Sequence, residues 1–363
     1  MNTPSTLPNI IGLLLAAVPF AQALERPGVE FKIFQFPPDQ IPRIDGNMDD
    51  WAIVPKDYII GTDQLSDTVR GHGTNFNRTN LDVQVHVGWV KGLNQIYFLY
   101  EASDDYWDFA RTDLHNDIFE VVVDSDRSGG PLIKQMLPQF KDHPAETHFK
   151  HHGVHAQNYH IFTPAEGKDW AMVWGCQPWI KELPYANAAQ RYNFRPGQSG
   201  KLVLEFWITP FDYAPAEGPG RAVVSQLKEN AIIGLSWAVL DYDDEKAEHY
   251  DGFWNLSHKT TMYGNASDLC AFRLMSLEPG LRKVSEARWS FQVVDAARRL
   301  VAFRDESVGE IKSWKWDFGD GQTSTERHPQ HRYEKSGEFT VTLWIEGPAG
   351  KSRRAKVWDL FLK

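Results

Sequence analysis

Acidic side chains recur at the ends of strand-like segments in the first two thirds of the chain. One set, which also includes an Asn, lies between positions 104 and 126, and a second follows a long apolar segment: Asp104, Asp105, Asn116, Asp117, Asp124 and Asp126, then Asp241, Asp243 and Asp244. Hard cations are bound by several oxygen atoms that converge from loops. Neither set has the spacing of an EF-hand loop. The two interpretations are a calcium site, with Asp104, Asp117, Asp124, Asp126, Asp241 and Asp243 as candidate ligands, and solvated loop tips.

Histidines are concentrated in one part of the chain. Seven of the 13 lie between His115 and His160, including the stretch HFKHHGVH at 148–155. Imidazoles can bind zinc or copper together with carboxylates. The chain has no HExxH motif, so a polar surface loop is the favoured interpretation. If a metal binds there, the first candidates are His148, His151, His152 and His155.

The stretch WDFGDG at 316–321 has two interpretations, a loop that binds an ion or phosphate and a tight turn between strands. Gly319 and Gly321 can adopt positive φ without steric cost, and Asp320 can bond back to the backbone. Asp-Gly between two apolar segments is a hairpin signal. A phosphate loop would be followed by Lys and a helix, whereas QTSTERHPQ follows here. We predict a turn, with calcium at Asp317 and Asp320 as the alternative.

Composition limits the classes of partner. The 363 residues exceed one average domain, so two domains are expected. From Ser285 onward the chain has 14 Lys and Arg residues and 12 Asp and Glu residues. The preceding part has 24 basic and 36 acidic residues, so it is strongly acidic. Such an acidic surface repels nucleic acid and suits neutral glycans or cations. The two cysteines, Cys176 and Cys270, form no CxxC motif. The sequence does not decide whether they form a disulfide with each other.

The first 23 residues have the pattern of an export signal. NIIGLLLAAVPFAQA is an apolar core that ends in the small-x-small sequence Ala21-Gln22-Ala23. The apolar segment is too short to span a bilayer, and no later segment is long enough. We expect a cleaved signal over 1–23 and an exported protein in the periplasm, on the cell surface or in the medium.

Alternation of apolar and polar residues predicts many strands. Leu81, Val83, Val85, Val87 and Trp89 share one face of LDVQVHVGW, and KLVLEFWI and FTVTLWIE repeat the pattern. AIIGLSWAVL is almost entirely apolar, as expected of a strand covered on both faces. The best helical candidate is a turn or two near Ala222 to Asn230. We predict an all-β chain of two β-sandwich domains, 24–280 and 285–363, separated near SLEPGLRKVSE.

The C-terminal segment resembles the PKD domain, an immunoglobulin-like β-sandwich. The resemblance covers about 75 residues from Arg288 and rests on WDFGDG, then Pro329, His331, Tyr333 and Gly337, and the closing TVTL at 340–343. It implies a spacer or interaction module without catalytic activity, through which the protein could contact other proteins.

The preceding domain resembles carbohydrate-binding module family 9. The motifs that carry this resemblance keep their order over about 240 residues: RIDGNMDDWA, IYFLYEASDD, NDIFEVVVDSD, GKLVLEFWITPFDY, IIGLSWAVLDYDD and LCAFRLMSLE. The resemblance implies a β-sandwich that binds sugars, often beside a glycoside hydrolase, and that carries structural calcium.

The resemblance assigns candidate sugar-binding residues. Glu120 matches the acidic residue that bonds sugar hydroxyls, but Leu114 stands where binding members have a Trp, and the expected Arg is replaced around Tyr159 or His160. Flat aromatic faces for sugar C–H groups must therefore come from elsewhere. Trp107, in a polar segment, has two interpretations: a replacement for the missing Trp, or a ring that folds back onto the sandwich. The candidate residues are Trp107, Glu120, Tyr159, Trp254 and Tyr263.

These features favour an exported, non-catalytic polysaccharide-binding protein, an accessory to glycoside hydrolysis. The chain contains no nucleophile elbow and no zinc-protease motif. One alternative is a structural or adhesive surface protein whose sandwich has lost sugar binding. A second is a haem- or metal-binding sandwich, which would need inward-facing ligands such as His86 and Met172. Hydrolysis by the His-rich segment is a third.

Overall fold

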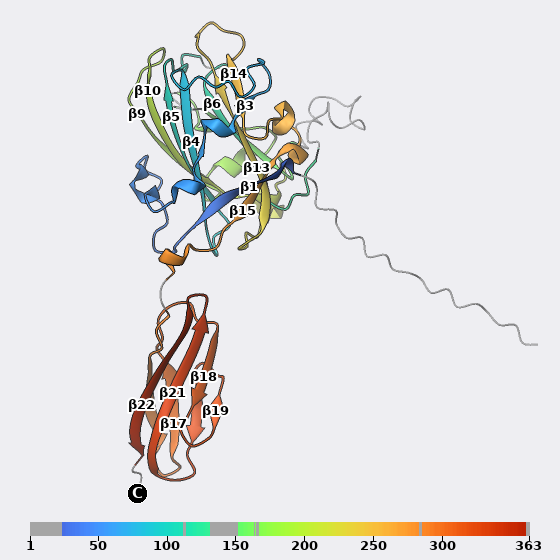
Figure 1. The fold of residues 1–363 in the computed structure, drawn as a ribbon. Helices are drawn as coiled ribbons and strands as arrows, with labels where there is room; N and C mark the ends of the chain where they lie inside the picture. Colours follow the sequence, from blue (N-terminus) through green and yellow to red (C-terminus); the bar gives the residue numbers. More distant parts are fainter. Residues whose placement is uncertain are drawn as a thin grey trace, which may run out of the picture. The chain divides into compact units, whose positions relative to one another are not determined.

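A computed structural model describes residues 24–111, 114–130, 152–162, 164, 167–282 and 285–360 (Figure 1). The expected signal over 1–23 lies outside these ranges. The chain divides into two compact units that follow one another at Met275 and Ser276, with Gln35–Gln40 grouped with the second. Strands dominate both units, and no helix within the described ranges is long and apolar enough to cross a membrane.

The N-terminal unit is a sandwich of two layers whose strands are mainly antiparallel. The first layer runs in the order β8 (Ala171–Val173), β7 (Gln157–Phe162), β6 (Ile118–Asp124), β13 (Ile232–Asp241), β15 (Cys270–Leu274) and β1 (Glu25–Phe36), with β14 (Gly252–Asn255) on β13 and β3 (Ser66–Asp67) on β14. The second layer contains β4 (Leu81–Val90), β5 (Ile96–Asp104), β10 (Gly200–Ile208) and β9 (Ala186–Tyr192), with β2 (Ile60–Gly61) on β4. β1 pairs with both β15 and β4, in parallel with β15, and so joins the two layers.

Short elements connect these strands. They are the hairpin of β11 (Phe211–Tyr213) and β12 (Val223–Val224) and the 3₁₀ turns η1 (Met48–Trp51), η2 (Lys56–Tyr58), η3 (Thr62–Gln64), η6 (Pro178–Lys181), η7 (Pro219–Arg221), η8 (Thr260–Tyr263), η9 (Ala266–Asp268) and η10 (Pro279–Leu281). The prediction of helix near Ala222 to Asn230 is wrong. That segment begins with β12 and continues without helix, because pairing with β11 overrides a weak local preference.

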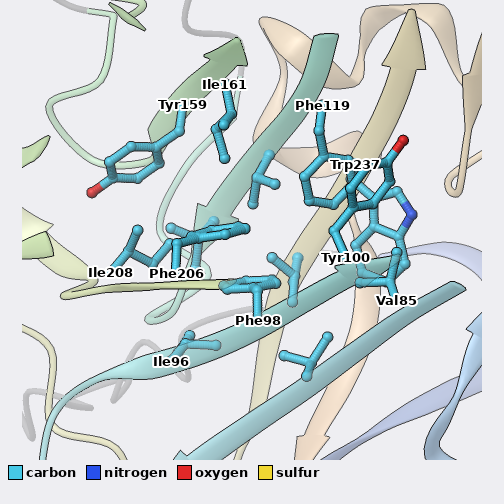
Figure 2. Close-up of a cluster of buried hydrophobic side chains, with 14 of the residues drawn as sticks. Val85, Ile96, Phe98, Tyr100, Phe119, Tyr159, Ile161, Phe206, Ile208 and Trp237 are labelled. Atoms are coloured by element: carbon cyan, nitrogen blue, oxygen red, sulfur yellow. The ribbon is translucent and has the colours of Figure 1, made fainter. Parts of the chain in front are cut away.

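Aromatic and β-branched side chains from both layers meet in the core (Figure 2). The alternation predicted for β4 is confirmed, since its five apolar residues are at most 2% exposed. Within the second layer, Phe98 and Phe206 stack on neighbouring strands with ring centres 4.6 Å apart, and across the layers Tyr100 lies 4.4 Å from Phe119. β13 is buried on both faces, as predicted, because a second apolar cluster covers its outer side. Burial of each such side chain contributes about 1.5–3 kcal/mol to the free energy of folding.

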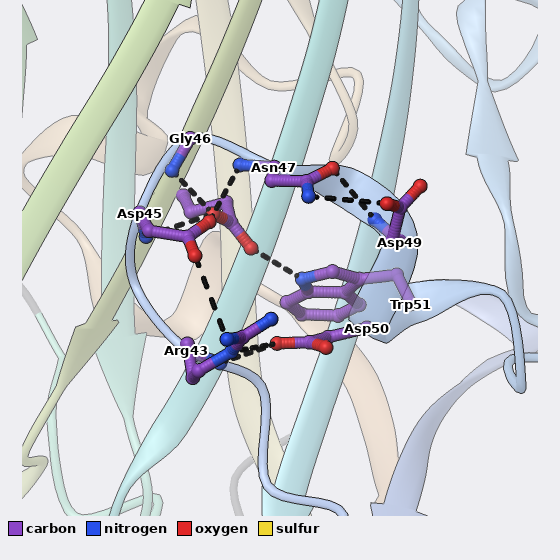
Figure 3. Close-up of polar contacts among 8 residues, drawn as sticks. Arg43, Asp45, Gly46, Asn47, Asp49, Asp50 and Trp51 are labelled. Atoms are coloured by element: carbon purple, nitrogen blue, oxygen red, sulfur yellow. Dashed lines mark hydrogen bonds and ion pairs between the residues drawn. The ribbon is translucent and has the colours of Figure 1, made fainter.

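One buried carboxylate anchors the segment that contains RIDGNMDDW to the second layer (Figure 3). Glu205, on β10, is fully buried and accepts hydrogen bonds from Trp51 Nε1 at 2.8 Å, Gly46 N at 2.7 Å and Asp45 N at 3.2 Å. Burial raises the pKa of this carboxyl, while the three donors act in the opposite direction. The exposed pair Arg43 and Asp50 lies in the same segment at 3.2 Å.

The C-terminal unit is a smaller sandwich. One sheet has the order β16 (Trp289–Asp295), β17 (Leu300–Asp305) and β20 (Gln330–Arg332), and the other β19 (Thr323–Ser324), β18 (Ser313–Asp317), β21 (Gly337–Gly347) and β22 (Gly350–Leu360). Trp316 fills the space between the sheets, with ring centres 5.7 Å from Trp289 and 5.6 Å from Phe303. Its Nε1 donates to Glu326 O at 3.0 Å, which satisfies the buried indole.

WDFGDG forms the predicted turn. β18 ends at Asp317 and pairs in antiparallel fashion with β19, so the residues between them reverse the chain. Asp317 Oδ1 accepts from Gly319 N at 2.9 Å, and Asp320 Oδ1 accepts from Gln322 N at 3.0 Å. Asp320 Oδ2 also lies 2.8 Å from His331 Nε2. The two carboxylates are therefore used within the turn and its neighbouring strand.

The two glycines of this turn provide a matched test. Gly319 has φ +81°, and a Cβ there would lie 2.8 Å from Thr340 O, whereas Gly321 has φ +91° and open space around it. We expect Gly321→Ala to cost about 1–2 kcal/mol through strain alone. Gly319→Ala should cost roughly 1–3 kcal/mol more, because the backbone of β21 must move. Urea denaturation of the full chain measures both, and equal losses would contradict the assigned close approach.

Candidate functional site

A carboxylate occupies the middle of the outer face of the first layer. Glu120 lies on β6 between His160 on β7 and Ala238 on β13, and alternation directs its neighbours Phe119 and Val121 into the core. Glu120 is only 2% exposed. Such a carboxylate is retained only with polar partners, because a buried charge is costly in isolation.

The partners of Glu120 come from β7 and the segment before β15. Asn158 Nδ2 donates to Glu120 Oε1 at 2.9 Å and to the Tyr263 carbonyl at 3.1 Å, and His160 Nδ1 lies 3.7 Å from Glu120 Oε1. Tyr263 is half-buried, and burial raises the pKa of its phenol, with a further contribution from Glu120. The ring of Trp174 is 6.2 Å from that of His160.

The polar atoms of this Glu120 group are of the kinds that bond hydroxyls, and Glu120 and Asn158 are buried at 2% and 0% exposure. The carboxylate of Glu120 accepts hydrogen bonds, and the amide of Asn158 can both donate and accept them. The Asn158 Oδ1 atom is buried without a hydrogen-bond partner among the described residues. Tyr263 adds an aromatic ring to the same region. Sugar hydroxyls need this combination of donors, acceptors and apolar surface.

The structure corrects the roles expected of three aromatic residues. Trp107 is 1% exposed, stacks on Phe194 at 4.7 Å and donates from Nε1 to Gly200 O at 3.1 Å. Tyr159 and Trp254, at 0% and 6% exposure, belong to the core cluster. These rings fill the sandwich and present no open face to a sugar. Of the expected aromatic residues, Tyr263 lies beside Glu120, while Leu114 is exposed at 38%.

Three of the predicted metal ligands converge at one end of the sandwich. Asp104 ends β5, Asp117 precedes β6 and Asp241 ends β13, and each offers an oxygen within 4.8 Å of the others. Each of the three is at most 5% exposed. Asp104, Asp105 and Asp243 form an overlapping group, in which Asn80 donates to both oxygens of Asp243 at 3.1 Å.

These carboxylates are incompletely satisfied. Asp117 accepts from Asp108 N and Tyr242 N, but Asp104 Oδ2 and Asp241 Oδ1 have no hydrogen-bond partner in the described part of the chain. Burial raises the pKa of Asp104 to about 7, and burial with neighbouring carboxylates raises the pKa of Asp117 and Asp241 well above the usual range. A hard cation with several oxygen ligands fits this group, which we call the acidic pocket.

Asp124 and Asp126 are not part of the acidic pocket. Asp124 ends β6, at the opposite end of the strand from Asp117, and accepts from Gly129 N at 2.9 Å. Burial raises its pKa to about 7. Asp126 is exposed and accepts from Ser128 N. The six predicted ligands therefore divide between two ends of the sandwich.

The other candidate metal ligands are dispersed. His148 and His151 lie outside the described residues. His152 Nε2 lies 3.1 Å from Tyr263 O, whereas His155 Nδ1 lies 3.0 Å from Asp212 O, so these two rings contact different segments. His86 belongs to the outer face of the second layer, 3.5 Å from Glu101, and Met172 packs on the outer cluster of the first. They do not face each other across the core, as the haem interpretation requires.

Both cysteines are free thiols. Cys176 is partly buried, and Cys270 is buried on β15. Burial raises the pKa of the Cys270 thiol to about 12, so it is protonated at neutral pH.

Asn158 is the residue of the Glu120 group that sequence reasoning missed. It shares a face of β7 with His160, while Tyr159 and Ile161 point into the core. Polar residues at alternate positions of QNYHIF are the signal that could have identified it. The pairing of β7 with β6 then brings Asn158 to Glu120.

Comparisons with known proteins cover both units. Residues 287–359 match the family model of the PKD domain. Collagenase ColQ1 of Bacillus cereus is 45% identical over 53 residues, and the pre-pro-metalloprotease PrtV of Vibrio cholerae is 49% identical over 47 residues. These matches cover 15% and 13% of this chain, which spans 5% of the length of each relative.

Solved structures include similar domains. The PKD1 domain of Vibrio cholerae PrtV is 31% identical, with 21% of this chain and 96% of that chain covered and a TM-score of 0.20. A carbohydrate binding module family 9 from Caldicellulosiruptor kristjanssonii, in complex with cellotriose, is 12% identical, with 70% and 97% covered and a TM-score of 0.43. The family match identifies residues 287–359 as a PKD domain.

Proposed function

We propose that the N-terminal unit binds a carbohydrate through the Glu120 group and that the protein is an exported, non-catalytic polysaccharide-binding protein. The observation that carries this proposal is a buried carboxylate with Asn158 and His160 beside it and the half-buried ring of Tyr263 close by. The family 9 motifs of the sequence support the same function. The proposal of export is supported by the apolar segment and cleavage pattern of residues 1–23. The PKD domain then serves as a spacer or as a contact for another protein.

We further propose that the acidic pocket binds a structural calcium ion. Asp104, Asp117 and Asp241 would supply oxygen ligands, and Asp243 and Asp105 extend the group toward solvent. A bound cation neutralises carboxylates that burial alone disfavours. It would also tie together the ends of β5 and β13 and the start of β6.

The alternative is a structural or adhesive surface protein. It is favoured by the burial of Trp107, Tyr159 and Trp254, which removes the aromatic faces expected for a sugar. This alternative predicts a stable sandwich without affinity for glycans.

Calorimetric titration of the full chain with soluble polysaccharides and their oligosaccharides tests the proposal. Glu120→Gln should weaken binding roughly 10- to 100-fold, because it removes charge-assisted hydrogen bonds to hydroxyls. Glu101→Gln is the matched control, since Glu101 stands beside His86 on the other layer in a similar pair. Absence of heat with every glycan, or an equal effect of both variants, would support the structural alternative.

A further inference from the structure

The PKD domain has a tryptophan between two cations on the outer face of its larger sheet. Lys315 on β18 is directly opposite Trp344 on β21, and Trp344 is opposite Arg353 on β22. The adjacent residues Trp316 and Leu343 are fully buried between the sheets. Paired residues share a face and successive residues alternate, so the row Lys315–Trp344–Arg353 faces outward. Its strands lie side by side in Figure 1.

The two cations of this row are not neutralised. Lys315 Nζ lies 5.9 Å from the centre of the Trp344 ring, and Lys315 and Arg353 are both exposed. Neither takes part in an ion pair with any residue that the structure describes. On the neighbouring rows, Glu346 pairs with Lys351 at 3.6 Å, and Asp317 accepts from Gly319 N. The row therefore combines one indole, with the Lys315 ammonium over its ring, and the exposed guanidinium of Arg353.

The surroundings leave the indole accessible from one side. Trp344 is half-buried, and the next row places Thr342 opposite Ala355, both smaller than the ring. Two strand spacings separate Lys315 from Arg353, about 10 Å. A flat ring with a cation on each side suits an extended polymer whose own rings are apolar on one face and carry anions at intervals.

We propose that this row binds an acidic polysaccharide built from carboxylated sugars. The Trp344 ring would pack on the C–H face of one pyranose, and the carboxylates of sugars on either side would pair with Lys315 and Arg353. The row is a different surface from the Glu120 group, which offers a carboxylate and suits neutral hydroxyls. The inference therefore goes beyond the proposed function and does not depend on it.

Affinity electrophoresis and calorimetry of the full chain with polygalacturonate test this site. We expect Trp344→Ala and the double variant Lys315→Gln/Arg353→Gln each to weaken binding roughly tenfold, and the double variant to reduce the salt dependence. The matched control is Arg332→Gln/Lys335→Gln, which removes two exposed cations outside the row and should change affinity less than twofold. Trp344→Phe keeps an aromatic face and should retain most of the binding.

Several outcomes would overturn the inference. Fully methyl-esterified polygalacturonate has the same backbone without charge, and equal affinity for it would exclude carboxylate recognition. Binding of dextran sulfate but not polygalacturonate would show that the row recognises sulfate groups instead of carboxylates. Loss of polygalacturonate binding in Glu120→Gln, with Trp344→Ala unchanged, would place the site in the N-terminal unit. Circular dichroism of each variant separates loss of binding from loss of fold.

Discussion

Without divalent cations, the N-terminal unit is expected to lose stability as the pH rises from about 4 to 8. Burial raises the pKa of Asp104 to about 7 and that of Asp117 and Asp241 well above the usual range. The folded state therefore binds more protons than the unfolded state above pH 4, and stability falls with pH. The raised pKa of Asp104 alone corresponds to a loss of folding stability of at most about 4 kcal/mol, at about 1.4 kcal/mol per pKa unit.

Calcium should reverse this dependence. A bound cation keeps the carboxylates ionised, so its affinity increases as they lose protons. At 100 times its dissociation constant, the ion stabilises the fold by about 2.7 kcal/mol. Thermal unfolding followed by tryptophan fluorescence between pH 4 and 8, in calcium and in chelator, measures both effects.

A neutral isostere distinguishes this explanation from general acidity. Asp104→Asn removes one buried charge, so we expect higher stability in chelator at pH 8 together with loss of the calcium response. Asp244→Asn is the control, because Asp244 is exposed and lies outside the acidic pocket. A calcium response that survives in Asp104→Asn would contradict the assigned ligand.

Removal of the Glu205 carboxylate should cost about 3 kcal/mol or more of unfolding free energy. Glu205→Ala leaves Trp51 Nε1, Gly46 N and Asp45 N without their acceptor (Figure 3). An unsatisfied buried donor costs about 1–3 kcal/mol, and three donors share this carboxylate. Glu205→Gln keeps one acceptor oxygen and should lose less.

Asp50→Ala provides the comparison within the same segment. Its pair with Arg43 is largely exposed, so we expect a loss of about 0.2–1 kcal/mol. Urea denaturation at constant pH measures all three variants. A Glu205→Ala loss no larger than that of Asp50→Ala would show that the carboxylate does not anchor the segment.

The sequence by itself determined the features that depend on near neighbours. Alternation along β4 and the all-apolar β13 predicted an all-β sandwich, because side chains of a strand alternate between its two faces. The WDFGDG turn could also be predicted from the sequence, because glycine readily adopts the positive φ that Gly319 and Gly321 have in the structure. The PKD domain was likewise predicted from motifs within short segments, and the family match over residues 287–359 agrees.

Tertiary structure alone decided which distant residues meet and which rings are covered. Asp104, Asp117 and Asp241 come together because the ends of β5 and β13 and the start of β6 lie at one edge, whereas Asp124 lies at the other end of β6. Trp107 stands in a polar segment, yet Phe194 covers its ring. Asn158 reaches Glu120 only through the pairing of β7 with β6. Local patterns specify the faces of a strand, but burial and convergence depend on pairing between strands far apart in the chain.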